Sequence, residues 1–261
     1  MTTPDYTGLS GVPRWKSLTK KLKARGGRNS QGRITMRHQG GGNKKMYRIV
    51  DFKQNRMDSK AMVETLEYDP YRTAFIARIK YQDGSHAYVL APEGMKVGTE
   101  ILTAESVPLK TGNRMKLKNI PVGYQIHNIE LHPGAGGILA RSAGSYAELL
   151  ANDAGYADIK LSSGEVRRVN SEGLASLGQV SNAEWNLVSI GKAGRSRWMG
   201  IRPTVRGKAM NPVDHPYGGG EGSQPRGTRK PKTKWGKVTG GHKTRNRKAR
   251  SNHFILQRRP K

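Results

Sequence analysis

The sequence predicts a mainly β chain in which two small barrels are flanked by long basic extensions. Short segments that alternate apolar and polar residues fill the middle of the chain, and turn residues separate them at the roughly 8–12-residue spacing typical of barrels or a sandwich. Positive charge is concentrated toward the two ends. Two barrels over about residues 37–120 and 121–190 fit the spacing, which leaves 1–36 and 191–261 as basic extensions.

The first barrel is predicted from three strand-like segments. "MVETLEY" (Met62–Tyr68) alternates with the strand period of two, and Asp69–Arg72 follows as a proline-containing turn. "TAFIARIKY" and "HAYVLA" read as the next two strands. The Asp-Gly pair between them, in "QDGS", predicts a tight hairpin turn.

The second barrel is predicted from a strand and a hairpin. Ile126–Leu131 reads as the strand, and "YADIKLSSGEVRRV" (Tyr156–Val169) reads as the hairpin. Ser145–Asp153 fits a helix or a strand equally well, because short apolar runs are ambiguous. The segment Lys118–Gly123 lies between the two groups of strands and marks the predicted boundary.

The net charge of +28 is distributed unevenly along the chain. Residues 10–60 hold 15 Lys or Arg against 2 acids, and residues 191–261 hold 20 against 2. Residues 61–190 are almost neutral, with 12 basic and 14 acidic residues. Self-repulsion on this scale destabilises a compact state, so the composition predicts a polyanionic partner that offsets it.

Composition also limits the classes of protein to which the chain can belong. It contains no cysteine, so disulfides and thiolate metal sites are excluded. No apolar run approaches the roughly 20 residues of a membrane span. The start "MTTPDYTGLS" lacks the basic and apolar pattern of a secretory signal.

The basic extensions predict nucleic-acid binding. Lysine and arginine neutralise phosphates and release counterions, and arginine adds planar stacking and bidentate contacts. Both extensions are poor in apolar residues, so we expect them to order only on binding. Glycine clusters such as "HQGGGNKK" and "HPYGGGEG" let bare backbone approach phosphate or ribose, although flexible linkers are an alternative.

Tryptophans in the extensions have two interpretations. Trp15, Trp198 and Trp235 stand in the basic contexts "PRWKS", "SRWMG" and "TKWGK". Each fits stacking on an unpaired base or local anchoring of an extension.

Catalysis by the protein is the weaker hypothesis. "GKVTGGHKT" departs from a phosphate-binding loop because His242 separates its second glycine from the lysine. The seven histidines, which are His38, His86, His127, His132, His215, His242 and His253, do not have metal-ligand spacing. The alternative function is a nucleic-acid processing factor that uses Asp214 and His215, although adjacent side chains of an extended chain point in opposite directions. A DNA-compacting protein is a third reading, which the patterned neutral middle disfavours.

A set of motifs resembles one family in both content and order. The motifs are "GRITMRHQGGGNKKMYRIVDF", "LEYDPYRTAFIA", "NIPVGYQIHNIE", "GILARSAGSYAELLA", "SGEVRRV", "GKAGRSRWMGIRPTVRG" and "AMNPVDHPYGGGEG". They are similar to the bacterial-type ribosomal protein L-two family of the large subunit, over about residues 10–261. The resemblance implies an oligonucleotide-binding-type barrel, then an SH3-like barrel, with extensions buried in large-subunit ribosomal RNA.

The resemblance also implies roles for particular residues. Arg72 and Arg141 match RNA-contacting arginines of the family, and Tyr217 stands where the family loop commonly has a second histidine. Together with the basic and glycine-rich motifs, it predicts RNA contacts at Arg28, Arg37, His38, Lys44, Lys45, Arg72, Arg141, Arg195, Arg197, Trp198, Arg202, Arg206, Lys243, Arg245 and Arg247. It predicts a loop near the peptidyl transferase region that includes Asn211, Asp214, His215, Tyr217, Gly218, Gly219 and Gly220.

The implied partners follow from the same resemblance. They are large-subunit ribosomal RNA, small-subunit RNA at an intersubunit bridge, other ribosomal proteins and nearby tRNA. The implied roles are subunit association, tRNA placement and assembly of the peptidyl transferase region, with no catalytic residue. No cofactor is expected, and any magnesium or potassium would be held mainly by RNA. The expected location is the large subunit in a bacterial cytoplasm or a mitochondrial matrix.

Overall fold

The computed structural model describes residues 2–222, 224–241 and 243–260, which form two units. The first, here called the β unit, comprises Met1–Lys23, Lys44–Lys192 and Ser251–Lys261. The second, the basic unit, comprises Ala24–Asn43 and Ala193–Arg250. The basic unit contains 20 of the 47 Lys and Arg residues of the chain but only 2 of its 19 acids. Charge is therefore segregated between the units as well as along the sequence.

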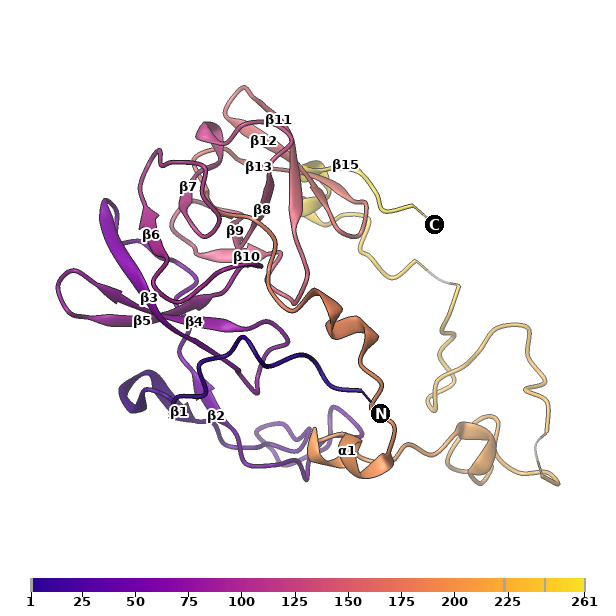
Figure 1. Ribbon diagram of the computed structural model, residues 1–261. Coiled ribbons are helices and arrows are strands. Elements are labelled where there is room, and N and C mark those ends of the chain that lie inside the picture. Colours follow the sequence, from indigo (N-terminus) through magenta and orange to yellow (C-terminus); the bar gives the residue numbers. More distant parts are fainter. Residues whose placement is uncertain (1, 223, 242, 261) are drawn as a thin grey trace. The chain divides into compact units, whose positions relative to one another are not determined.

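The β unit is built on one extended sheet and two short ones (Figure 1). The large sheet has the strand order β15-β13-β12-β11-β8-β14-β7-β6-β3-β4-β5, and β1 pairs with β2 and β9 with β10. The strands are β1 (Thr19–Lys21), β2 (Met46–Arg48), β3 (Ser59–Glu67), β4 (Ile76–Tyr81), β5 (His86–Leu90), β6 (Glu100–Thr103), β7 (Arg114–Lys116), β8 (Gln125–His127), β9 (Ile129–Glu130), β10 (Gly137–Leu139), β11 (Ala147–Asp153), β12 (Tyr156–Leu161), β13 (Val166–Asn170), β14 (Leu174–Leu177) and β15 (Ile255–Gln257).

The two largest apolar cores of the described residues lie along this sheet. The first is formed by β3 to β6 and includes Val63, Ile79 and Ile101. The second is formed mainly by β7, β8 and β11 to β14 and includes Leu149 and Ile159. Bulges between Val63 and Thr65 in β3, and between Leu149 and Ala151 in β11, let these strands curve around their cores. A single parallel pair, Thr103 with Arg114, joins the two halves of the sheet.

Strand accounts for 29% of the chain and helix for 10%, so the mainly β prediction is confirmed. The segment with equal helix and strand signals, Ser145–Asp153, contains strand β11. The predicted strand Ile126–Leu131 is divided into β8 and β9, because Asn128 between them has φ 49°. A residue in this left-handed region cannot continue a strand.

The two units group segments that are distant in the sequence. Residues 24–43 belong with 193–250, whereas residues 2–23 and 251–260 belong to the β unit. The C-terminal strand β15 pairs antiparallel with β13, as Figure 1 shows, and joins Val166 to Gln257 and Arg167 to Ile255. This pairing covers the outer edge of β13 and extends the sheet by one strand.

Regular structure is sparse in the basic unit. Its α-helix is α1 (Ala193–Trp198), and no helix among the described residues is long and apolar enough to cross a membrane. Short 3-10 turns occur in both units, at Lys16–Leu18, Leu117–Asn119, Ala183–Leu187, Gly207–Ala209 and Arg250–Phe254.

The second core contains a buried charged cluster. Arg114 and Glu130 are almost completely buried, and Arg114 Nη2 lies 3.3 Å from Glu130 Oε1. Arg114 also donates from Nη1 to the Asn128 carbonyl at 2.8 Å and to Ser176 Oγ at 3.2 Å. Burial lowers the pKa of Arg114 to about 10, although the negative charge of Glu130 acts to raise it. The guanidinium therefore stays charged at neutral pH.

His127 lies in the same core and is expected to make stability depend on pH. Its Nδ1–H donates to the Gly178 carbonyl at 2.9 Å. Burial, assisted by the charge of Arg114, lowers its pKa from 6.5 to about 4. Between those values the unfolded chain binds a proton that the folded chain does not bind. The free energy of unfolding should therefore fall by roughly 3 kcal/mol as pH drops from about 6.5 to 4.

Denaturant unfolding of the full chain between pH 7 and pH 4 measures this effect. A His127→Gln variant keeps an amide donor for Gly178 but does not titrate. We expect its free energy of unfolding to vary less over this window than that of the unmodified chain. Equal pH dependence of the two proteins would show that His127 is not the group responsible.

Candidate RNA-binding surface

Arg72 and Arg141, which are 69 positions apart in the sequence, meet at one aromatic ring in the β unit. Their guanidinium carbons lie 5.6 Å and 4.4 Å from the centroid of the Phe52 ring. Arg72 ends the Asp69–Arg72 turn after β3, and Arg141 follows β10. The two turns are joined directly, because the Ala143 N–H donates to Thr73 Oγ1 at 3.1 Å. The structure therefore unites the two arginines in one place.

The two arginines differ in how much of each remains available to a ligand. Arg72 forms an ion pair with the fully buried Asp69, and 14% of its side chain is exposed. Asp69 also accepts the Tyr71 N–H at 2.9 Å, which holds the turn. Arg141 is exposed, and its one protein hydrogen bond in the described structure is to the Gly137 carbonyl at 3.2 Å. We infer that Arg72 fixes the turn and Arg141 presents the free donors.

Phe52 was not among the residues predicted from the sequence, although both arginines lie over its ring. Its carbonyl accepts the Gly137 N–H at 2.9 Å, which connects it to the strand that precedes Arg141. Arg72 also lies over Tyr47, 5.7 Å from its centroid. The signal in the sequence was an aromatic residue in "YRIVDF", next to basic residues, but nothing there indicated which loops would reach it.

A glycine cluster in the basic unit brings two predicted RNA-binding motifs together. His38, with φ 62°, accepts the Arg202 N–H at its carbonyl, and Gln39 bridges to Ile201. A Cβ on Gly42 would lie 2.9 Å from the Gly200 backbone, so only glycine permits this approach. The "HQGGGNKK" glycines thus allow two segments of the chain to pack closely.

Helix α1 places three predicted RNA-binding residues beside this cluster. Arg197 Nη2 would lie 3.3 Å from a Cβ on Gly41, and its Nη1 is buried without a hydrogen-bond partner among the described residues. Trp198 is half exposed, and its carbonyl accepts the Asn43 N–H. Arg195, on the same helix, is partly buried.

The remaining predicted basic contacts are scattered. Most are exposed and lie in segments with little regular structure: Arg28, Arg37, Lys44, Arg202, Arg206, Lys243, Arg245 and Arg247. Lys45 is partly buried just before β2. His242 lies outside the described residues.

The three tryptophans are used differently. The Trp15 ring stacks on His86 with centroids 4.4 Å apart, and the Trp15 backbone N–H donates to Tyr88 Oη at 3.0 Å. Trp15 therefore anchors the N-terminal segment on the β unit. Trp235 is 71% exposed, with Lys234 Nζ 4.7 Å from its centroid.

The loop from Met210 to Gly222 is closed by its own backbone. The Gly219 N–H donates to the Met210 carbonyl at 3.0 Å, and the N–H groups of Asp214 and His215 donate to Asn211 at 3.0 and 3.2 Å. A Cβ on Gly218 would lie 2.2 Å from the Asn211 carbonyl oxygen, so this position requires glycine. Val213 is 97% exposed at the turn that this closure produces.

Tyr217 anchors the loop to the segment that follows. Its hydroxyl accepts the Lys232 N–H, donates to the Lys230 carbonyl at 3.3 Å and lies 3.1 Å from Thr228 Oγ1. The tyrosine therefore has an internal structural use that a histidine at this position could not reproduce with the same reach.

His215 and Asp214 do not form a catalytic pair. His215 Nδ1 accepts the Tyr217 N–H at 3.1 Å, and the two rings lie 5.1 Å apart. Its imidazole packs against Gly207, where a Cβ would lie 2.5 Å from the ring. Asp214 is exposed, and the described residues contain no group of three His, Asp or Glu side chains placed to hold a metal. This geometry gives the processing-factor alternative no support.

Two family models match the chain, and the boundary between them falls between strands β6 and β7, where the two halves of the large sheet meet. Residues 15–103 match the family described as Ribosomal Proteins L2, RNA binding N-terminal domain. Residues 110–236 match Ribosomal Proteins L2, C-terminal domain. The chain belongs to the ribosomal protein L2 family.

Membership in the L2 family establishes the general role. The chain is a structural, RNA-binding constituent of the large ribosomal subunit, with ribosomal RNA and ribosomal proteins as partners, and it is not an enzyme. The two cores and the β content are consistent with the oligonucleotide-binding-type and SH3-like barrels that the sequence motifs implied.

Proposed function

We propose that Arg141, supported by Phe52 and Arg72, is the principal phosphate-binding position on the β unit of this L2 protein. The observation that carries this proposal is that Arg141 is an exposed residue whose guanidinium carbon lies over the Phe52 ring, 4.4 Å from its centroid. Stacking restricts a flexible side chain, so less conformational freedom is lost when it binds phosphate.

We further propose that the basic unit makes the wider RNA interface and presents the Met210–Gly222 loop near the peptidyl transferase region. Its 20 basic and 2 acidic residues supply the electrostatic attraction, and the closed loop supplies a fixed shape. In this role the loop supports tRNA placement and assembly, while RNA performs the chemistry. Contact with small-subunit RNA, which supports subunit association, belongs to the same proposal. The bacterial-type motifs support a ribosome of a bacterial cytoplasm or a mitochondrial matrix.

Replacing Arg141 with alanine should weaken binding of the full chain to a large-subunit ribosomal RNA fragment by about tenfold, or about 1.4 kcal/mol. Fluorescence anisotropy across a salt series measures this change. The slope of log affinity against log salt should become shallower by about one, because one phosphate contact is lost. Arg141→Lys should retain the slope but lose part of the affinity, since lysine lacks the planar fork.

Arg168→Ala is the matched control for this series. Arg168 is bound to Asp158 at 2.8 Å and belongs to the same unit, so its removal should change RNA affinity little. Equal losses of RNA affinity from Arg141→Ala and Arg168→Ala would show that the β unit attracts RNA by general charge alone.

Replacing His215 with alanine should lower the yield of assembled large subunits or weaken tRNA binding. The variant loses the ring that packs on Gly207 and accepts the Tyr217 N–H. Sedimentation and tRNA binding should change more than the rate of peptide-bond formation in intact particles. Normal assembly and tRNA binding together with a defect confined to a proton-dependent chemical step would contradict this role.

A further inference from the structure

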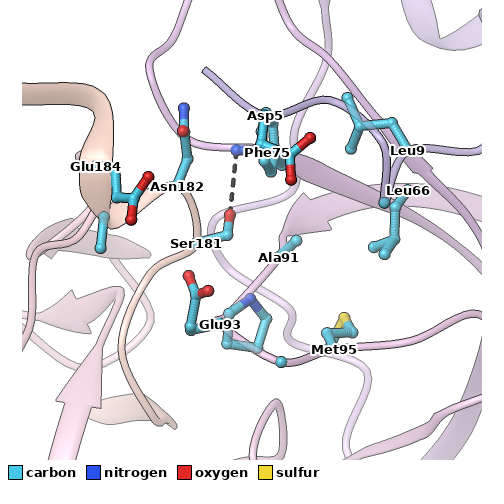
Figure 2. A pocket seen from close by; sticks show the side chains of 14 residues that line it. Asp5, Leu9, Leu66, Phe75, Ala91, Glu93, Met95, Ser181, Asn182 and Glu184 are labelled. Atoms are coloured by element: carbon cyan, nitrogen blue, oxygen red, sulfur yellow. Dashed lines mark hydrogen bonds between the residues drawn. The ribbon is translucent and has the colours of Figure 1, made fainter. Parts of the chain in front are cut away.

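A cleft of about 510 Å³ in the β unit has a charge that is opposite to that of the chain as a whole. Its lining includes three acids, Asp5, Glu93 and Glu184, and contains no lysine, arginine or histidine (Figure 2). The chain carries 47 Lys and Arg residues, so a concave surface of this size without one is unexpected.

The cleft has an apolar floor and a fixed frame. Leu66, Phe75 and Met95 are among the apolar residues that line it. Ser181 Oγ accepts the Phe75 N–H at 3.2 Å, as the dashed line in Figure 2 shows, and the Ser181 N–H donates to the Ala91 carbonyl at 3.1 Å. These bonds join the residue before strand β4 and the residue after strand β5 to the segment that enters the 3-10 turn Ala183–Leu187.

The N-terminal segment forms one wall of this cleft. The Ser10 N–H donates to the Leu66 carbonyl, and the Leu66 N–H donates back to Ser10 Oγ, both at 2.9 Å. The ring of Tyr6 packs on Phe75 with centroids 6.1 Å apart. These contacts set Asp5 and Leu9 along the wall, so the segment completes the cleft.

The three carboxylates are available to a ligand. Asp5 Oδ1 accepts the Thr7 N–H at 2.9 Å, but none of the three carboxylates forms an ion pair within the part of the chain that the structure describes, and all three residues are exposed. Elsewhere in the same unit, Glu105 and Glu172 are held by Lys116 and Lys118. The cleft therefore concentrates negative charge that no basic side chain of the described residues neutralises.

We propose that this cleft binds an extended, lysine- or arginine-bearing segment of another ribosomal protein. RNA phosphates would be repelled by the three carboxylates, whereas a cationic peptide complements them. The apolar floor suits the aliphatic stems of lysine and arginine, whose charged ends would reach the acidic rim. The proposal extends beyond the RNA-binding role, and it rests on the placement of this chain in the large subunit.

Crosslinking in assembled large subunits tests the proposal. The probe is a benzophenone side chain introduced at Ala183, which lines the cleft, with Glu100 of strand β6 as the matched exposed position outside it. After irradiation, we expect Ala183 to give a crosslink to a Lys- or Arg-rich peptide of a neighbouring protein that Glu100 does not give. Mass spectrometry identifies the peptide, and co-sedimentation confirms incorporation of the probe-bearing chain.

Charge reversal then tests whether the acids are responsible. Glu93→Lys with Glu184→Lys should lower the crosslink yield by about tenfold, while Glu100→Lys should leave it unchanged. Reversing the basic residues of the identified peptide to glutamate should restore the yield. The proposal would be overturned by crosslinks only to ribosomal RNA, only to the basic unit of this same chain, or to nothing in particles that contain the probe. Failure of the unmodified chain to co-sediment with large subunits would instead contradict the placement itself.

Discussion

Replacing Glu130 with glutamine is expected to destabilise the β unit by about 3–5 kcal/mol, because it leaves Arg114 as an uncompensated buried charge. Both side chains are almost completely buried, and they lie 3.3 Å apart. The loss should appear as a lower denaturant midpoint for the full chain, measured at high salt so that repulsion between the basic segments is screened.

Glu130 has a second function that glutamine cannot reproduce. Its two carboxylate oxygens accept the N–H groups of Gly134 at 3.0 Å, Gly136 at 3.1 Å and Leu174 at 3.2 Å. An amide has one oxygen, and its NH₂ group would face N–H donors. The loop around Gly134 would lose these hydrogen bonds. Gly137 follows this loop, and it donates its N–H to the Phe52 carbonyl and accepts a hydrogen bond from the Arg141 side chain. We therefore expect RNA affinity to fall along with stability.

A double-mutant cycle with Arg114→Met separates the charge pair from simple loss of packing. If the pair is coupled, the double variant should be more stable than the sum of the single losses predicts. Strict additivity of the two free-energy changes would contradict the coupling. An unchanged midpoint for Glu130→Gln would show that the buried cluster does not hold the second core.

Much of the fold could be predicted from local pattern, because the strands alternate clearly. The hairpin Tyr156–Val169 and the strands before and after the Asp-Gly turn follow from periodicity and turn chemistry alone. The short strands β1, β2 and β15 lack such a pattern. They form because each pairs with a strand that is distant in the sequence, and the local sequence does not show this pairing.

The candidate site was predictable in part, and for a similar reason. The family motifs indicated Arg72 and Arg141. Nothing in the sequence showed that both would lie over the Phe52 ring, or that Arg72 would form an ion pair with Asp69. The glycines were expected to allow close approach to RNA. In the structure, Gly42 and Gly218 are already required by contacts with the protein's own backbone. Sequence composition indicates that bare backbone is needed, but it does not indicate what approaches it.

Replacing Gly218 with alanine is expected to open the Met210–Gly222 loop. The new Cβ would lie 2.2 Å from the Asn211 carbonyl oxygen and 2.6 Å from that of Met210. Both neighbours are backbone atoms of the same loop, so the overlap is relieved only if the bond from the Gly219 N–H to Met210 breaks. We expect a loss of roughly 3 kcal/mol from the closed loop, which lowers the ratio of closed to open forms about a hundredfold.

The consequence should be confined to the loop and to the steps that need it. We expect purified large subunits to contain much less of the Gly218→Ala chain than of the unmodified chain when both are expressed together. Quantitative mass spectrometry gives this ratio, and limited proteolysis reports cleavage of the opened loop. Unfolding of the β unit should be unaffected, because the Met210–Gly222 loop belongs to the basic unit.

Gly194→Ala is the matched control for Gly218→Ala, because it makes the same chemical change without a clash. A Cβ at Gly194 has no other atom within 4 Å, and alanine is favoured over glycine in helix α1. If Gly218→Ala were incorporated as well as Gly194→Ala, the closed loop would not be needed for assembly. If Gly218→Ala were excluded while its loop resisted protease, the alanine would act by meeting RNA rather than by opening the loop. The two measurements together therefore decide whether the glycine serves the protein's own backbone or the partner.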